Sequence, residues 1–219
     1  MLANIILDYF FKGGPIMWPI LIAFLGALAV ILDRAFWWMQ HRSSLKPAVQ
    51  EQVREDLGNG DFSAAWQATA NTGDDYLDTL HEGMGHAHTS MLAAMQLRAT
   101  QTVEKAEARL WVLSTFITLA PLLGLLGTVT GIMRSFSFVG DDQLAASKVS
   151  GGIAEALIAT ACGLGVAILS LLPYNYYRRC AAQLRAALER WINHAELLVN
   201  SAKHHGHDLE DWCRTLLQK

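Results

Sequence analysis

The sequence has few charged residues and few cysteines. Charged residues make up 17% of the 219 residues, and the formal net charge is −3. No segment is rich enough in Lys and Arg to neutralise a run of phosphates, so the sequence does not indicate nucleic-acid binding. The three cysteines, Cys162, Cys180 and Cys213, are odd in number and far apart. They predict neither a disulfide framework nor a zinc site.

Common catalytic patterns are also missing. The sequence has no glycine loop of the kind that holds phosphates, no nucleophile with a plausible base, and no carboxylate pair at catalytic spacing. Histidines occur in two groups, at 81–88 and at 204–207. Neither group has the spacing of the zinc-protease helix, and Gly83 and Gly85 weaken any helix around the first group. We therefore expect no enzyme activity, no metal and no cofactor. The histidines expected to lie at the solvated surface are His81, His86, His88, His204, His205 and His207.

Hydrophobic residues make up 52% of the chain, and three long stretches are almost free of charge. A helix rises about 1.5 Å per residue and the hydrocarbon core is about 30 Å thick, so a span needs about 20 such residues. The stretches predict membrane helices at 13–39, 110–135 and 149–177. The second contains Pro121, which a membrane helix tolerates with a kink. The third contains a single charged residue, Glu155.

Lys and Arg are distributed unevenly beside these spans. They are scarce in residues 1–12 and 136–148 and more frequent in residues 40–109 and 178–219. Because cytoplasmic segments carry an excess of Lys and Arg, we expect the first two segments to be periplasmic and the last two cytoplasmic. The predicted fold is an all-α membrane protein with three transmembrane helices and long helical extensions into the cytoplasm. Its N-terminus would be periplasmic and its C-terminus cytoplasmic.

The two long segments outside the spans have helical patterns. Helices are predicted at 50–57 and 63–70, on either side of a Gly-Asn-Gly-Asp turn. Apolar residues recur at helical spacing over 89–109, which predicts a helix that continues unbroken into the second span. An apolar stripe over 174–202 has steps of three and four residues and requires a partner helix. That partner is either the helix over 89–109 of the same chain or a helix of another subunit.

Glu155 is the strongest functional candidate. An ionisable group inside a span costs about 2.5–3.5 kcal/mol on insertion scales, so a neighbouring group must compensate it. A carboxyl group in apolar surroundings can be neutral at one stage of a cycle and ionised at another, as a proton carrier requires. The alternative is that Glu155 lies near the outer end of the third span and reaches interfacial water.

Small residues dominate one face of each of the last two spans. Such faces let helices approach closely, so we expect them to contact protein. Thr128 and Thr160 either hydrogen-bond to their own helices or line a polar path beside Glu155. The residues expected to line a pore or to pack helices are Pro121, Leu125, Gly127, Gly131, Gly152, Ala159 and Gly163.

Two segments resemble the signature spans of the ExbB/TolQ/MotA proton-channel family, most of all its ExbB branch. Residues 120–133 read APLLGLLGTVTGIM, and residues 151–161 read GGIAEALIATA. The three-span layout and the long inner loop are also similar, so the resemblance covers most of the chain.

The resemblance implies a ring of identical subunits, a pentamer in this family, in the bacterial inner membrane and surrounded by its lipids. The second and third spans would line a pore around a single-span ExbD-like partner, and Glu155, Thr128 and Thr160 match positions associated with proton passage. The implied function is to use the proton motive force to energise outer-membrane transport through a TonB-like protein. Because Gly151 and Thr130 stand where the family often has Pro and Trp, a TolQ-like subunit of the Tol-Pal system is an alternative. Two others are a passive membrane scaffold and a small-solute transporter.

Overall fold

The computed structural model describes residues 10–137 and 145–217. Every regular element in these two ranges is a helix, which confirms the all-α prediction. Three helical stretches are long and apolar enough to cross a membrane, and each overlaps one predicted span. The predicted outer segments 1–12 and 136–148 lie largely outside the described residues.

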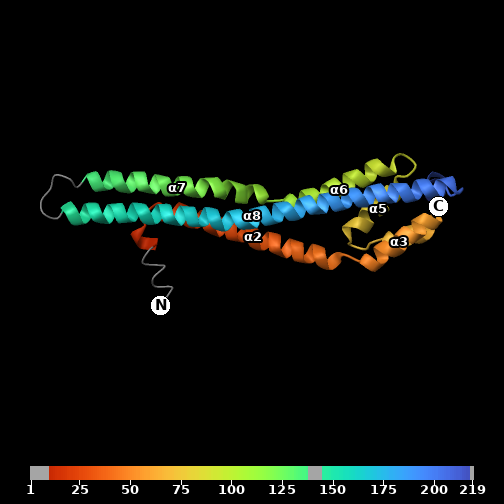
Figure 1. Ribbon diagram of the computed structural model, residues 1–219, viewed down its shortest axis with the longest axis horizontal. Coiled ribbons are helices and arrows are strands. Elements are labelled where there is room, and N and C mark those ends of the chain that lie inside the picture. The colour runs from red at the N-terminus through yellow and green to blue at the C-terminus, as the bar shows by residue number, and fades with distance from the viewer. Residues whose placement is uncertain (1–9, 138–144, 218–219) are drawn as a thin grey trace. The chain divides into compact units, whose positions relative to one another are not determined.

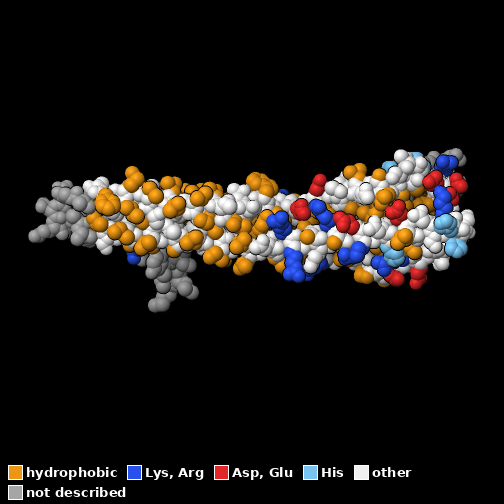
Figure 2. Space-filling model, turned by 45° about the horizontal axis from the view of Figure 1, so that its top comes forward, with side chains coloured by type: hydrophobic (Ala, Val, Ile, Leu, Met, Phe, Trp, Pro, Cys, Tyr) orange, Lys and Arg blue, Asp and Glu red, His pale blue; other side chains and the backbone are white. Residues whose placement is uncertain are grey.

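The chain divides into two units. Unit 1 consists of Met1–Asp33 and Arg109–Tyr177, and unit 2 consists of Arg34–Ala108 and Arg178–Lys219. Helices α2 (Met17–Ser44) and α8 (Ala145–His204) contribute residues to both. On the face shown in Figure 2, apolar side chains predominate over unit 1, whereas charged side chains gather over unit 2.

Unit 1 is built from α2, α7 (Leu110–Phe136) and the first part of α8. Figure 1 shows α7 and this part of α8 side by side. Met17 and Ile20 of α2 pack in one apolar cluster with Ala120 of α7 and Val166 of α8. Many large apolar side chains of α7 and α8 remain exposed, as expected for a surface that contacts lipid or other chains.

Glycines bring α7 and α8 into close contact. A Cβ added at Gly163 would meet the carbonyl oxygen of Ala120 and lie 3.1 Å from the Cα of Gly124. A Cβ added at Gly124 would lie 2.9 Å from the Cα of Thr160. Since backbone lies against backbone at these positions, the contact has no room for a larger side chain.

The junction between α6 (Met91–Glu107) and α7 differs from the prediction. The helix over 89–109 does not continue unbroken into the second span, because the backbone leaves the helix at Ala108 and Arg109. Arg109 has a φ of +63°, in the left-handed region, and its side chain forms an ion pair with Asp33 of α2. Neither residue of the break is Gly or Pro, so apolar periodicity did not indicate it.

Unit 2 contains more helices than the sequence pattern predicted. The two helices expected at 50–57 and 63–70 are confirmed, although the first begins earlier and α4 ends at Thr69. Two further helices, at 75–85 and 209–217, were not predicted. The histidines at the end of α8 are therefore followed by another helix. The remaining elements are α3 (Pro47–Asn59), α4 (Phe62–Thr69), α5 (Asp75–Gly85) and α9 (Leu209–Leu217).

Helix α5 forms in spite of Gly83 and Gly85. Asp74 caps its start by accepting a hydrogen bond from the backbone N–H of Tyr76 at 2.9 Å. Gly83 is buried, and a Cβ there would meet the side chain of Met95 in α6. The glycine that weakens the isolated helix thus permits its packing.

The apolar stripe of α8 packs within the same chain. Ala181 and Leu188 of α8 lie in one buried cluster with Met95 and Val103 of α6, and Figure 1 shows the two helices side by side. Of the two partners left open by the sequence, the structure therefore selects the helix of the same chain.

A buried polar contact joins α2, α5 and α6. His41 donates a hydrogen bond to the Asp75 carboxylate at 2.8 Å, and the Thr102 hydroxyl donates another at 3.1 Å. Burial raises the pKa of Asp75, but these two bonds and the charges of His41 and Arg98 outweigh it and hold the pKa below its usual value. Because both donors are far away in sequence, this contact positions α5 in unit 2.

Gly163→Ala should destabilise unit 1. The added methyl group would meet the backbone of α7, and overpacking of this kind costs about 1–3 kcal/mol. Gly165→Ala is the matched control in the same helix, since a Cβ there would meet nothing within 4 Å. Thermal unfolding of the purified chain in detergent would measure both variants. Equal destabilisation by the two would contradict this account of the contact.

Candidate functional site

Glu155 lies about three turns into α8, with its side chain 22% exposed. Arg134 donates a hydrogen bond from Nη1 to Glu155 Oε1 at 3.3 Å, and the two form an ion pair. Arg134 belongs to the last turn of α7, where the negative end of the helix dipole favours a cation. The charge compensation that the sequence requires for Glu155 is therefore supplied by the neighbouring helix.

The segment before α2 approaches the same carboxylate. Gly14 has a φ of +73°, and a Cβ at this position would overlap Glu155 Oε1. A Cβ at Gly13 would lie 3.1 Å from the side chain of Ile158, one turn further along α8. The Glu155 side chain is thus held between the end of α7 and residues 13–14 of the same chain.

The two candidate threonines make different hydrogen bonds. The Thr128 hydroxyl donates to the carbonyl oxygen of Leu125 in its own helix at 2.6 Å. The Thr160 hydroxyl donates across to the carbonyl oxygen of Gly124 in α7 at 2.9 Å, and also approaches Ala156 in α8 at 3.3 Å. Thr160 therefore joins the two helices one to two turns from Glu155. A role of either residue in proton passage stays a prediction.

Most residues predicted to line a pore or to pack helices lie where α7 meets α8. A Cβ at Gly127 would lie 2.6 Å from that of Ala159, and one at Gly152 would meet the hydroxyl of Ser135. Leu125 is different, because it is 57% exposed in the single chain. The five residues at the contact are Gly127, Gly131, Gly152, Ala159 and Gly163.

Arg134 and Gly14 are the site residues that sequence reasoning missed. Arg134 lies at the end of the second predicted span, and the sequence patterns gave it no role in the site. The hairpin could have identified Arg134. Because α7 and α8 are antiparallel, later residues of α7 contact earlier residues of α8. The pairs Gly127 with Ala159 and Gly131 with Ala156 follow this register, and continuing it brings Arg134 to the level of residues 152–153, within one turn of Glu155.

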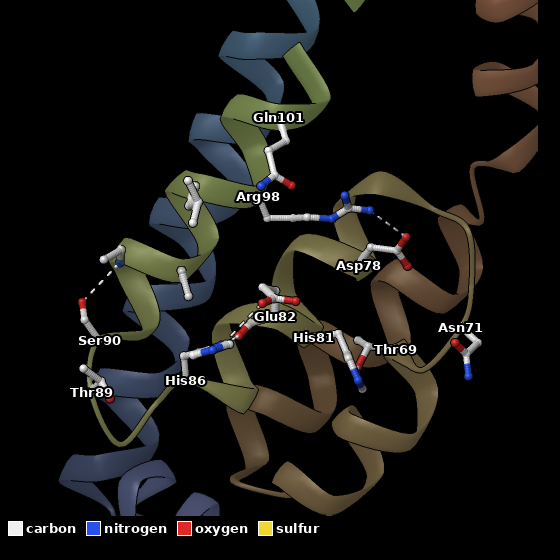
Figure 3. A pocket seen from close by; sticks show the side chains of 13 residues that line it. Thr69, Asn71, Asp78, His81, Glu82, His86, Thr89, Ser90, Arg98 and Gln101 are labelled. Carbon is white, nitrogen blue, oxygen red and sulfur yellow. Dashed lines mark hydrogen bonds and ion pairs between the residues drawn. The ribbon is translucent and has the colours of Figure 1, made fainter. Parts of the chain in front are cut away.

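His81 and His86 line a groove of about 590 Å³ between α5 and α6 in unit 2. Figure 3 shows Arg98 reaching from α6 to Asp78 of α5, with which it forms an ion pair at 3.3 Å. His86 donates a hydrogen bond to the carbonyl oxygen of Glu82 at 2.9 Å. In the part of the chain that the structure describes, no group of three His, Cys, Asp or Glu residues is arranged to hold a metal ion.

His81 is half-buried and is therefore less solvated than expected. Its ring stacks on Trp66 with centroids 3.7 Å apart, and Nδ1 is hydrogen-bonded to the Thr69 hydroxyl at 2.9 Å. Burial lowers the pKa of His81 below its usual value of 6.5, in spite of the nearby carboxylates of Asp78 and Glu82. The sequence did not indicate this burial because the stacking partner lies in another helix.

Comparison with known proteins gives consistent matches. Residues 68–190 match the model of the MotA/TolQ/ExbB proton channel family. The ExbB-like 1 biopolymer transport protein of Synechocystis sp. is 35% identical over 179 residues, which cover 78% of this chain and 69% of the relative. ExbB-like 3 of the same organism is 32% identical over 85% of this chain and 91% of its own length. The Tol-Pal system protein TolQ of Haemophilus influenzae is 44% identical over 38% of this chain and 37% of its own length.

Thr160→Val should weaken the contact between α7 and α8 by about 0.5–1.5 kcal/mol, because the hydrogen bond to Gly124 is lost. Thr128→Val removes only a bond within one helix and should cost less. Unfolding of the purified chain in mixed detergent micelles would compare the two free energies. A larger loss for Thr128→Val would contradict the cross-helix role of Thr160.

His81→Phe should reduce the pH dependence of stability. Because burial lowers the pKa of His81 in the folded chain, its contribution to stability is present above about pH 6.5 and is lost as the pH falls through the lower pKa of the folded state. Phe can keep the stacking on Trp66 but cannot take up a proton. The melting temperature should therefore fall less between pH 7.5 and 5.5 than in the wild type, while the control His86→Gln should behave like the wild type. An unchanged pH dependence in His81→Phe would contradict this assignment.

Proposed function

The chain belongs to the MotA/TolQ/ExbB proton channel family, and from this premise we propose that Glu155 carries protons through a ring of identical subunits. The chain is a multi-pass inner-membrane protein and a subunit of a membrane proton channel. Its family transduces energy and is not a family of catalytic enzymes. Members of the family work in complexes with partner proteins.

The ion pair between Glu155 and Arg134 is the observation that supports the proposal best. Glu155 is the only charged residue between 149 and 177, and its side chain is mostly covered by the end of α7 and by residues 13–14. An acid with a compensated charge can remain ionised in largely apolar surroundings and become neutral when it takes up a proton. Thr160 and Thr128 are the polar groups that we propose to accompany it in the pathway.

The exposed apolar surface of unit 1 supports assembly with other chains. Leu122 of α7 and Leu157 and Ile168 of α8 are each at least 60% exposed. We propose that neighbouring copies, membrane lipids and an ExbD-like single-span partner cover this surface in a pentameric ring. Leu125 would then face the pore or an adjacent subunit.

The proposed output is the energising of TonB-dependent outer-membrane transport. The relatives that match over most of the chain carry ExbB-like names, and the TolQ relative matches over a shorter part. One proton crossing 100 mV releases about 2.3 kcal/mol, so several protons would be needed for substantial mechanical work. With the N-terminus periplasmic, as the Lys and Arg distribution favours, unit 2 would lie in the cytoplasm.

Glu155→Gln should abolish proton-driven activity while the complex still assembles, because Gln cannot release a proton. Uptake of a TonB-dependent substrate would be measured in cells that make the chain with its partners, together with co-purification of the complex. Glu189→Gln is the matched control, since Glu189 lies on an exposed position of the same helix in unit 2. Wild-type uptake with Glu155→Gln would reject proton transfer by this residue and favour a passive scaffold. A defect in Tol-Pal function alone would favour the TolQ-like role.

A further inference from the structure

We propose that Arg134 is a positioning residue that holds the Glu155 carboxylate by an ion pair in the resting subunit and thereby controls its exchange of a proton. The proposal rests on the proposed function, because it concerns the same carboxylate. Arg134 acts through Glu155 and does not itself transfer the proton.

The geometry leaves one oxygen of the carboxylate for the proton. Among the described residues, Arg134 is the only hydrogen-bond partner of Glu155, and it contacts Oε1. Gly14 lies against the same oxygen. Oε2 is therefore the oxygen at which proton uptake would occur, and protonation there would remove the charge that attracts Arg134.

The backbone fixes Arg134 in this place. Ser135, the next residue, is buried, and its hydroxyl lies where a Cβ of Gly152 would be. One turn earlier in α7, Gly131 lies against Ala156, the residue after Glu155. Because close contacts flank the pair on both helices, Arg134 faces Glu155 without a change in the helix packing.

Among the described residues, Arg134 is the charged group that contacts Glu155, and Lys148 precedes Glu155 by seven residues in α8. Arg134 lies on α7, and Lys12 lies two residues before Gly14. Residues 149–177 of α8 and 13–32 of the α2 region contain no other charge. Arg134 is 55% exposed whereas Glu155 is 22% exposed, so the guanidinium reaches solvent and the carboxylate is the more sheltered partner.

Removal of the cation should make proton uptake easier and release harder. An opposite charge within about 4–6 Å favours the ionised form of an acid, and partial exposure reduces the effect. In Arg134→Gln the cation that favours the ionised carboxylate is absent, so we expect the pH profile of Glu155 labelling to move toward higher pH. Proton-driven uptake should fall because Glu155 remains loaded.

The test is carbodiimide labelling of Glu155 in membranes that contain the full complex, followed by mass spectrometry across a pH series. Carbodiimides react with the protonated carboxyl group, so the midpoint of labelling reports proton occupancy directly. Arg134→Gln should shift this midpoint upward, and Arg134→Lys should restore it toward the wild-type value. Arg109→Gln is the matched control, because Arg109 pairs with a carboxylate at the other end of α7. A wild-type midpoint in Arg134→Gln would overturn the proposal.

A second variant tests the geometry without removing the charge. The methyl group of Gly14→Ala would displace Oε1 from Arg134, so the midpoint should again shift upward. If Arg134→Gln fails to assemble, Gly14→Ala becomes the deciding variant. An unchanged labelling midpoint in Gly14→Ala would then overturn the proposal.

Glu155→Gln distinguishes failure of the proposed function from failure of the role of Arg134. If Glu155→Gln supports normal uptake, the proposed function fails. If it is inactive while the Arg134 and Gly14 variants label like the wild type, only the role of Arg134 fails.

Discussion

The close contact between α7 and α8 is the constraint on which the site depends. Gly124 and Gly163 bring the two backbones together, and Gly131 and Gly152 continue the contact toward the hairpin end. In lipid, helices gain little from apolar burial, so close van der Waals packing and hydrogen bonds between them must stabilise the pair. The same packing sets the register of the two helices, and the register determines which polar groups meet.

Two polar contacts follow from this register. The Thr160 hydroxyl reaches a backbone carbonyl of α7 because Gly124 exposes it, and the guanidinium of Arg134 reaches Glu155 at the end of the hairpin. Gly14 can approach the carboxylate because it has no side chain and adopts a positive φ. Within the described residues, the sheltered acid is paired with the cation Arg134, and this pair is built within one chain before any neighbour is added.

Unit 2 is stabilised by different interactions. Apolar residues of α6 and α8 form its core, while His41, Asp75 and Thr102 join three helices through buried hydrogen bonds. Buried polar groups of this kind require partners in fixed positions, which gives the unit a specific arrangement of its short helices. Since α8 is a single helix that contributes to both units, the residues of the candidate site and those of the unit 2 core belong to one continuous element.

The sequence by itself determined the all-α membrane class, the three apolar stretches and the helices near 50–57 and 63–70, and it singled out Glu155 as the functional candidate. These follow from local composition, since the length of an apolar run and the isolation of one acid can be read without knowing any contact. Only the tertiary structure decided the break at Arg109, the formation of α5 through Gly83, the partner of the α8 stripe and the pairing of Arg134 with Glu155. Each of these depends on residues far apart in the chain. Periodicity shows that a face is buried, but the identity of what covers it is set by packing between helices.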